Sequence, residues 1–131
     1  MRVIIFFTYG ISLKSWKDSG LLERELKLYK FLAENHNINF TFVTYGDHED
    51  QSVIKNNINI NVVPIYQYFK KSNNYFIGFL KSLFYPIKLN KIINFENSIL
   101  KTNQLWGSWI PIIIKLFYGC PLIVRTGYDL L

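Results

Sequence analysis

The sequence predicts an α/β fold, a three-layer domain with a mostly parallel sheet. First, a continuous run of β-branched and aromatic residues at positions 2–8 is typical of a strand buried on both faces, as in a parallel sheet. Second, the helical pattern that follows is long enough to cross back over that sheet. Third, 131 residues are enough for one domain with its own core. We therefore expect residues 1–131 to form a single domain.

The first predicted helix starts at Gly20 and ends near His36, after a polar loop at 9–19. Its apolar side chains recur at spacings of three and four, so they share the face that packs on the sheet. They are Leu22, Leu26, Tyr29 and Ala33, widened by Leu21, Leu28 and Leu32. Glu25 projects into this apolar arc. Two interpretations stay open: an acidic side chain in a first turn favours the helix dipole, or Glu25 lies at a ligand cleft.

A second strand is predicted at 38–45, with its aromatic residues inside. The polar loop at 46–50 that closes it holds His48 beside three carboxylates. Consecutive residues cannot all point at one ion, so we expect a solvated loop here and no metal site.

Three more strands follow. After a short helical turn at 51–56, residues 57–66 alternate isoleucine or valine with asparagine, which together with Pro64 indicates an edge strand. Residues 98–102 form a weaker strand pattern, and 121–125 form a final buried strand.

The segment at 75–93 is strongly apolar and helical, and Pro86 should kink or split it. Its main stripe consists of Phe76, Leu80, Leu83 and Ile87, whereas Lys81, Lys88 and Lys91 share another face. Such a helix either lies in a membrane interface through its lysine face or packs against the sheet. A last helix is predicted at 109–118, with Ser108 as its N-cap and Gly119 at its C-terminal end.

Composition limits the partners and the compartment. The net charge of +6 and the aromatic content of 18% favour anionic partners such as nucleotides, phospholipid surfaces or diphosphate-linked substrates. The basic residues are dispersed, which argues against nucleic-acid binding. Cys120 is the single cysteine, so an intrachain disulfide is excluded and a reducing cytoplasm fits. Lysines interrupt every apolar stretch, so we expect a soluble or peripheral protein.

Ligands of open α/β sheets bind beyond the carboxyl ends of the strands. Three predicted loops, at 9–20, 102–108 and 125–129, meet there. They carry donors and aromatic platforms suited to sugars and phosphates, namely Lys14, Trp16, Lys17, Asn103, Gln104, Trp106 and Arg125. The sequence has no G-x-G-x-x-G after the first strand, no Walker lysine motif and no nucleophile elbow.

Four sequence segments carry a resemblance to a known family. In chain order they are residues 6–25, Thr-Tyr-Gly-Asp at 44–47, Lys-Thr-Asn-Gln at 101–104 and Val-Arg-Thr-Gly-Tyr at 124–128. Together they resemble the N-terminal domain of family 4 (group 1) GT-B glycosyltransferases, over nearly the whole chain. The resemblance implies a Rossmann-like half of an enzyme that transfers a sugar from a nucleotide-sugar to a glycan or lipid-linked acceptor, without a metal or another cofactor. In that family the N-terminal half binds the acceptor.

The resemblance also implies roles for particular residues. Gly10 and Gly20 would belong to a loop facing the donor phosphates, Glu23 would match the family's loop-to-helix glutamate, and Thr126 and Gly127 are further substrate-binding candidates. Gly20 can equally mark a helix start, and Arg125 can hold a phosphate or pair with a carboxylate.

Two departures from the family pattern limit the prediction. The C-terminal donor domain with its paired-glutamate motif is absent from these residues, and the loop after the last strand lacks the histidine of many relatives. We therefore expect the acceptor-binding half of a glycosyltransferase for cell-envelope or lipid-linked glycans, inactive alone. It would be cytoplasmic, or peripheral on the inner face of the membrane. The alternative is a non-catalytic membrane-anchoring or partner-binding module of a split glycosyltransferase.

Overall fold

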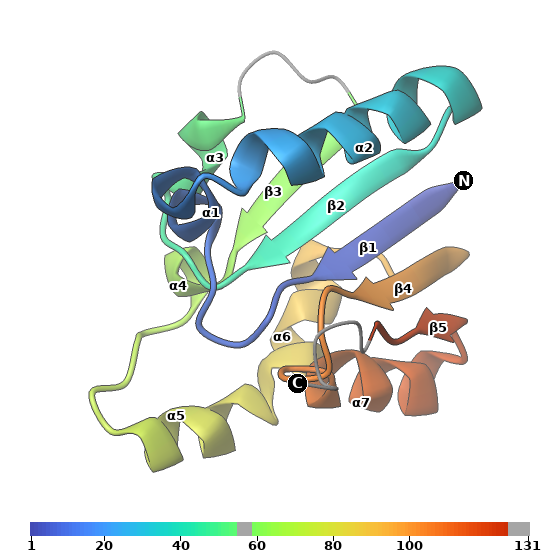
Figure 1. The fold of residues 1–131 in the computed structure, drawn as a ribbon. Helices are drawn as coiled ribbons and strands as arrows, with labels where there is room; N and C mark the ends of the chain where they lie inside the picture. The colour runs from blue at the N-terminus through green and yellow to red at the C-terminus, as the bar shows by residue number, and fades with distance from the viewer. Residues whose placement is uncertain (55–58, 126–131) are drawn as a thin grey trace.

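The computed structural model describes residues 1–54 and 59–125, and these build one five-stranded sheet in which every pairing is parallel (Figure 1). The strands are β1 (Arg2–Phe6), β2 (Asn39–Thr44), β3 (Ile60–Pro64), β4 (Ser98–Thr102) and β5 (Leu122–Ile123), in the spatial order β3-β2-β1-β4-β5. The predicted α/β fold is confirmed, and β3 is an edge strand as its alternating pattern indicated.

The central strand β1 is buried on both faces, as predicted. Ile4 pairs with Thr41 of β2 on one side and with Leu100 of β4 on the other. Ile4 and its neighbour Ile5 are both completely buried, although successive side chains of a strand point to opposite faces. Each face of β1 is therefore covered by packed side chains.

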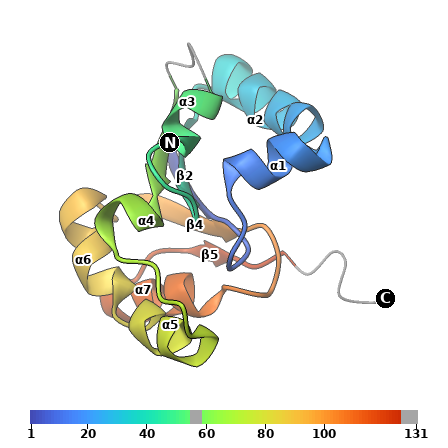
Figure 2. The same cartoon turned by 90° about the vertical axis from the view of Figure 1, so that its left-hand side faces the viewer.

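The helices form a layer on each side of the sheet (Figures 1 and 2). One layer contains α1 (Leu13–Ser19), α2 (Leu22–His36) and α3 (Asp50–Val53), and the other contains α5 (Tyr75–Ser82), α6 (Tyr85–Ile92) and α7 (Trp109–Tyr118), while the single turn α4 (Ile65–Tyr68) directly follows β3. From β1 to β3 the strands proceed in one direction across the sheet, and from β4 to β5 in the other. Since parallel crossovers are right-handed, this reversal sends the connecting helices to opposite faces. The loops after β1 and β4 therefore lead to opposite helix layers from the carboxyl edge, which is where such folds bind ligands.

Helix α1 was not predicted, because its sequence is a short polar segment within the expected loop. Its signal is a capping box: Ser12 Oγ accepts a hydrogen bond from Ser15 N at 3.1 Å, and Ser15 Oγ accepts one from Ser12 N at 3.4 Å. Gly20 ends α1 in the left-handed region, with φ of 81°, so it is a helix end and not the predicted helix start.

Asp50 holds α1 against the sheet, and the expectation of a solvated loop was wrong for this residue. Its buried carboxylate accepts hydrogen bonds from Leu13 N at 3.0 Å, Lys14 N at 3.2 Å and Thr44 Oγ1 at 2.6 Å. Gly46 has no Cβ, and a Cβ there would collide with this carboxylate. A long-range contact therefore fixes the start of α1.

The apolar segment at 75–93 splits into α5 and α6 next to Pro86, as predicted, but the predicted apolar stripe is wrong. Phe76 and Ile87 are 66% and 64% exposed. The buried positions are instead Gly78 and Ser82 on α5 and Tyr85, Pro86 and Leu89 on α6. Two short helices with different directions do not share the stripe of one straight helix, and α5 packs through its small residues.

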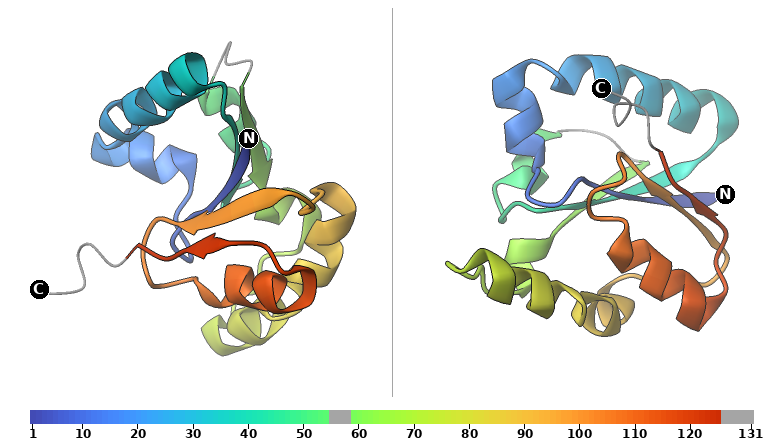
Figure 3. Two further views of the ribbon diagram at one scale, coloured as in Figure 1. Left: turned by 90° about the vertical axis from the view of Figure 1, so that its right-hand side faces the viewer. Right: turned by 60° about the horizontal axis from the view of Figure 1, so that its bottom comes forward.

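Three smaller predictions also need correction. Ser108 precedes α7, yet its backbone is helical and its side chain makes no capping hydrogen bond. The final strand is not buried, because β5 is at the sheet edge with α7 on one face, and Ile123 is 54% exposed (Figure 3). On α2 the predicted face is confirmed at Tyr29 and Ala33, whereas Leu21 and Leu28 are exposed.

Candidate functional site

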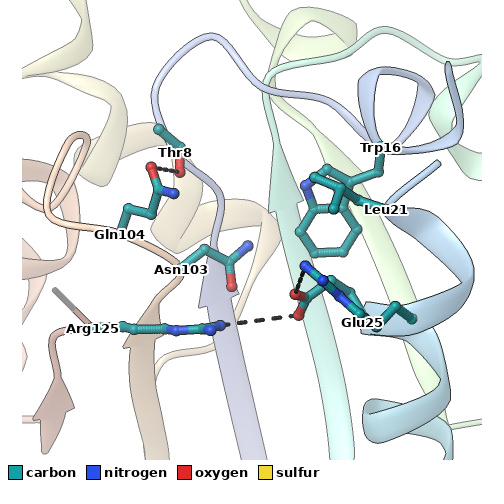
Figure 4. Close-up of a pocket in the computed structure, with 8 residues that line it drawn as sticks. Thr8, Trp16, Leu21, Glu25, Asn103, Gln104 and Arg125 are labelled. Atoms are coloured by element: carbon teal, nitrogen blue, oxygen red, sulfur yellow. Dashed lines mark hydrogen bonds and ion pairs between the residues drawn. The ribbon is translucent and has the colours of Figure 1, made fainter. Parts of the chain in front are cut away.

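A polar pocket lies at the carboxyl edge of the sheet, where the chain reverses direction, and we call it the edge pocket. It has a volume of about 220 Å³. Its lining comes from five segments: Thr8 after β1, Trp16 of α1, Leu21, Arg24 and Glu25 at the start of α2, Asn103 and Gln104 after β4, and Arg125 after β5 (Figure 4). Segments far apart in the sequence thus meet in one small cavity.

Trp16 forms a rigid wall of the edge pocket. Its indole stacks on Phe7 with ring centroids 4.4 Å apart, and the residue is buried. Because Asp50 anchors the first turn of α1, the helix that carries Trp16 is held in place. The pocket therefore has a preformed aromatic side.

Glu25 faces the pocket between two arginines. Its carboxylate lies 3.7 Å from Arg24 Nη2 and 4.0 Å from Arg125 Nη1, and its side chain is only 17% exposed (Figure 4). Glu25 is also in the first turn of α2, where it favours the helix dipole, while its role toward a ligand stays a prediction. Of the two roles open to Arg125, pairing with a carboxylate and holding a phosphate, the structure contains the first.

Asn103 carries the polar group that most needs an explanation. The residue is 8% exposed and follows β4, where its backbone N donates to Phe6 O at 3.2 Å. Within the described part of the chain its side-chain Nδ2 has no hydrogen-bond partner. Buried polar groups are normally paired, because an unpaired one costs about 1–3 kcal/mol. Nδ2 is thus an unused donor at the wall of a polar cavity.

Two side chains behind the pocket fix the orientation of this amide. Lys101 Nζ donates to Tyr29 Oη at 3.3 Å, and Tyr29 Oη donates to Asn103 Oδ1 at 3.5 Å. With Oδ1 facing Tyr29, Nδ2 is left on the pocket side. Burial, with a smaller effect of Glu25, raises the pKa of Tyr29 to about 12, so its hydroxyl keeps its proton at neutral pH. Burial and then Arg125 lower the pKa of Lys101, against the opposing effect of Glu25.

The loops after β1 and β4 are held together by close backbone contact. Tyr9 N donates to Trp106 O at 3.3 Å, and Thr8 Oγ1 donates to Gln104 Oε1 at 3.4 Å. Gly107 makes this approach possible, because its φ is +100° and a Cβ there would lie 2.9 Å from Tyr9 N. The spacing of the two pocket walls therefore depends on this glycine.

The structure brings together four of the residues predicted from the sequence and places others elsewhere. Trp16, Asn103, Gln104 and Arg125 line the edge pocket. The others are outside it. On α1, Lys14 pairs with Glu49 at 3.7 Å, Lys17 is exposed and Gly20 ends the helix. Glu23 lines a surface depression along α2, Gly10 lines a separate hollow, and Trp106 packs against Trp109. Thr126 and Gly127 lie outside the described residues.

Three pocket residues were not predicted. Thr8 follows β1 directly, so its position at the strand end is a signal that could have identified it. Arg24 was assigned to the outer face of the helix, and Leu21 to the face on the sheet; both reach the pocket because α2 starts only at Leu22.

Neither a metal cluster nor a membrane span is found in the described ranges. Residues 1–54 and 59–125 contain no group of three or more histidine, cysteine, aspartate or glutamate side chains that could hold a metal ion. None of the helices in these ranges combines the length and apolar character needed to cross a bilayer.

Comparisons with known proteins return no relative. No protein-family model, no curated protein and no solved structure matches this chain.

Proposed function

We propose that the edge pocket binds one sugar or phosphate unit of a ligand shared with a second domain or partner chain. The chain would then be the acceptor-binding half of a glycosyltransferase that uses a nucleotide-sugar and a glycan or lipid-linked acceptor. The observation that carries this proposal is the buried, unpartnered Nδ2 of Asn103 in a polar pocket at the switch point of a parallel sheet. The motif resemblance at residues 6–25 and 101–104 supports the class of enzyme.

The chemistry of the pocket suits sugar hydroxyls. Asn103 Nδ2 can donate, the Glu25 carboxylate can accept, and the Gln104 amide can do both, whereas each sugar hydroxyl donates and accepts at once. Arg24 and Arg125 add positive charge, which is suited to a phosphate. Neutral and anionic parts of one ligand can therefore be bound side by side.

The size of the pocket supports a shared site. Pockets for drug-sized ligands usually measure about 300–1,000 Å³, and the edge pocket measures about 220 Å³. That volume accepts one unit of a ligand and not a whole nucleotide-sugar. The rest of the ligand needs a second wall, so the chain alone should not transfer sugar.

Ligand-observed NMR tests the proposal. Monosaccharides, sugar phosphates and nucleotide-sugars are titrated against the wild-type chain, Asn103→Leu and Asn90→Leu, the last being an exposed position on α6. We expect binding to the wild type and the Asn90 control, and about tenfold weaker binding to Asn103→Leu, the loss of about 1.4 kcal/mol. Equal binding to all three proteins, or sugar transfer by the chain unaided, would contradict the proposal.

A second candidate function, docking on an anionic membrane surface, is favoured by one observation. The outer surface of the layer formed by α5, α6 and α7 exposes many large apolar side chains, namely Phe76, Ile77, Leu80, Phe84, Ile87, Leu116 and Phe117. Lys81, Lys88 and Lys91 are exposed on the same layer, although Lys88 Nζ also donates to Tyr68 O at 2.7 Å. Apolar and basic groups together suit an anionic lipid interface.

Co-sedimentation with anionic vesicles tests this second function. We expect salt-sensitive binding that is lost when Lys81, Lys88 and Lys91 are replaced by glutamine. Glutamine at Lys14 and Lys17, on the opposite helix layer, is the control and should leave binding unchanged. If both sets of variants sediment alike, this layer does not dock on lipid through its lysines.

A further inference from the structure

Four tyrosines line a second hollow, and we call it the tyrosine hollow. The tyrosines come from four segments: Tyr9 after β1, Tyr66 of α4, Tyr75 of α5 and Tyr85 of α6. Its volume is about 210 Å³. Residues far apart in the sequence thus place phenol rings around one small space.

Ring packing fixes the floor of this hollow. Tyr9 packs against Tyr45 at 4.9 Å and Trp109 at 5.3 Å between ring centroids, and meets Tyr75 edge to face at 5.8 Å. Gly78 lies below, where a Cβ would be 3.1 Å from the Tyr9 hydroxyl. The absence of a side chain at this position lets α5 pack closely against that hydroxyl.

Among the described residues, no hydrogen bond is formed by the hydroxyl of Tyr9, Tyr66, Tyr75 or Tyr85. Tyr75 is 63% exposed, and none of these hydroxyls is among the fully buried atoms that lack a partner, so they are open to solvent and to a ligand. Burial raises the pKa of Tyr9 and Tyr85, and raises that of Tyr66 to about 12. The hydroxyls of Tyr9, Tyr66 and Tyr85 therefore keep their protons at physiological pH and can donate as well as accept.

The hollow and the edge pocket adjoin along the chain. Thr8 lines the edge pocket and the next residue, Tyr9, lines the tyrosine hollow. The backbone between them is fixed by the hydrogen bond from Tyr9 N to Trp106 O. One extended ligand that crosses this backbone would enter both cavities.

We propose that the tyrosine hollow binds a second sugar unit of the acceptor, so that the acceptor is an oligosaccharide and not a single sugar. A sugar ring combines an apolar face with a rim of hydroxyls, which matches aromatic rings that carry unused hydroxyls. Lys71, which lies 5.5 Å from the Tyr66 ring centroid, adds a cation at the rim of the hollow. This inference rests on the proposed function of the edge pocket.

NMR of protein labelled at tyrosine and tryptophan tests the inference. The probes are the disaccharides cellobiose, maltose and chitobiose, and the monosaccharides glucose and N-acetylglucosamine. We expect a disaccharide to shift the ring signals of Tyr66 and Tyr75 together with the indole signal of Trp16, and to bind more tightly than its monosaccharide. Tyr75→Ala changes an exposed side chain and should weaken disaccharide binding about tenfold. Tyr66→Phe removes only a hydroxyl, and Tyr118→Phe on α7 is the control that should bind normally.

The outcomes separate this inference from the proposed function. If the Trp16 signal shifts while the tyrosine signals do not, the second subsite is refuted and the edge pocket stands. If the tyrosines shift and Trp16 does not, the hollow binds sugar but the proposed function fails. Undisturbed signals with every probe, or unchanged disaccharide affinity in Tyr75→Ala, overturn the inference.

Discussion

The substitution Asn103→Leu should weaken ligand binding and stabilise the unliganded protein at the same time. Leucine has the branched shape of asparagine, is somewhat larger and carries no polar atom, so the change leaves no cavity. It removes a buried amide nitrogen that has no partner in the described part of the chain. Residues that only support a fold do not behave in this way, because their replacement destabilises the protein.

The magnitude follows from the hydrogen bonds of Asn103. Removing an unsatisfied buried polar group recovers about 1–3 kcal/mol. The substitution also removes the hydrogen bond from Tyr29 Oη, which at 3.5 Å is long and contributes at most about 1 kcal/mol. Tyr29 Oη still accepts from Lys101 Nζ. The net gain in the free energy of unfolding is about 1 kcal/mol, or about 4 °C in melting temperature.

Urea unfolding and calorimetry of wild type, Asn103→Leu and the exposed control Asn90→Leu measure this gain. Asn90→Leu should change the unfolding free energy by less than about 0.5 kcal/mol. If Asn103→Leu instead lowers the free energy of unfolding by more than about 1 kcal/mol, Asn103 makes stabilising hydrogen bonds beyond the one described above. Such a loss would contradict a ligand-binding role for this amide.

Three further predictions concern the supports of the pocket and its titration. Gly107→Ala should lower the free energy of unfolding, measured with urea, by about 2–4 kcal/mol, because φ of +100° and a contact of 2.9 Å to backbone both oppose a Cβ. The control Gly119→Ala, with φ of +70° and open space around it, should lower it by only about 1–2 kcal/mol. Asp50→Asn should lower the free energy of unfolding by about 1.5–3 kcal/mol, since an amide cannot accept all three hydrogen bonds. The control Asp47→Asn, at an exposed position, should lower it much less. Equal losses in the two variants would show that Asp50 does not anchor α1. The pKa of Tyr29 rises from 10.0 to about 12 on folding, so the contribution of Tyr29 to stability is complete below pH 10 and is lost as the pH rises through 12. The urea midpoint of the wild type should therefore fall between pH 10 and 12, and that of Tyr29→Phe should fall by less.

Elements defined by local pattern were predictable from the sequence. The apolar run of β1 and the caps and apolar character of α7 gave boundaries close to those observed, and α7 runs over the predicted residues 109–118. Helix α1 was missed because it has only two apolar residues, Leu13 and Trp16, and a single spacing of three is too short to define a helical period. Its start is stabilised by Asp50, which is distant in the sequence, and no local rule includes that contact.

The predicted buried face of α5 was wrong for a different reason. Hydrophobicity predicted that Phe76 and Leu80 would pack inward, yet the small residues Gly78 and Ser82 do so. Ser82 Oγ accepts a hydrogen bond from Trp109 Nε1 at 2.9 Å, and this tertiary contact requires a small side chain. Packing between helices thus decided which face was buried.

The candidate site was predictable where loop position alone determines it. Asn103, Gln104 and Arg125 follow strand ends, so any parallel sheet in this order would bring them together. Lys14 and Lys17 do not line the pocket with Trp16, because a loop would let all three side chains face one cavity, whereas a helix sends them to different sides. The pairing of Glu25 with Arg125 also required the three-dimensional structure.

The side-chain amide of Asn103 gives the most direct test of the central claim, that this pocket is one wall of a sugar-transfer site. Its ¹⁵N–¹H signals, identified by their absence in Asn103→Leu, are followed during titration with sugar phosphates and nucleotide-sugars. We predict that a ligand moves these signals together with the indole signal of Trp16, as a new acceptor binds Nδ2. If the signals stay fixed with every member of the panel while ligand contacts appear elsewhere on the protein, the claim is contradicted.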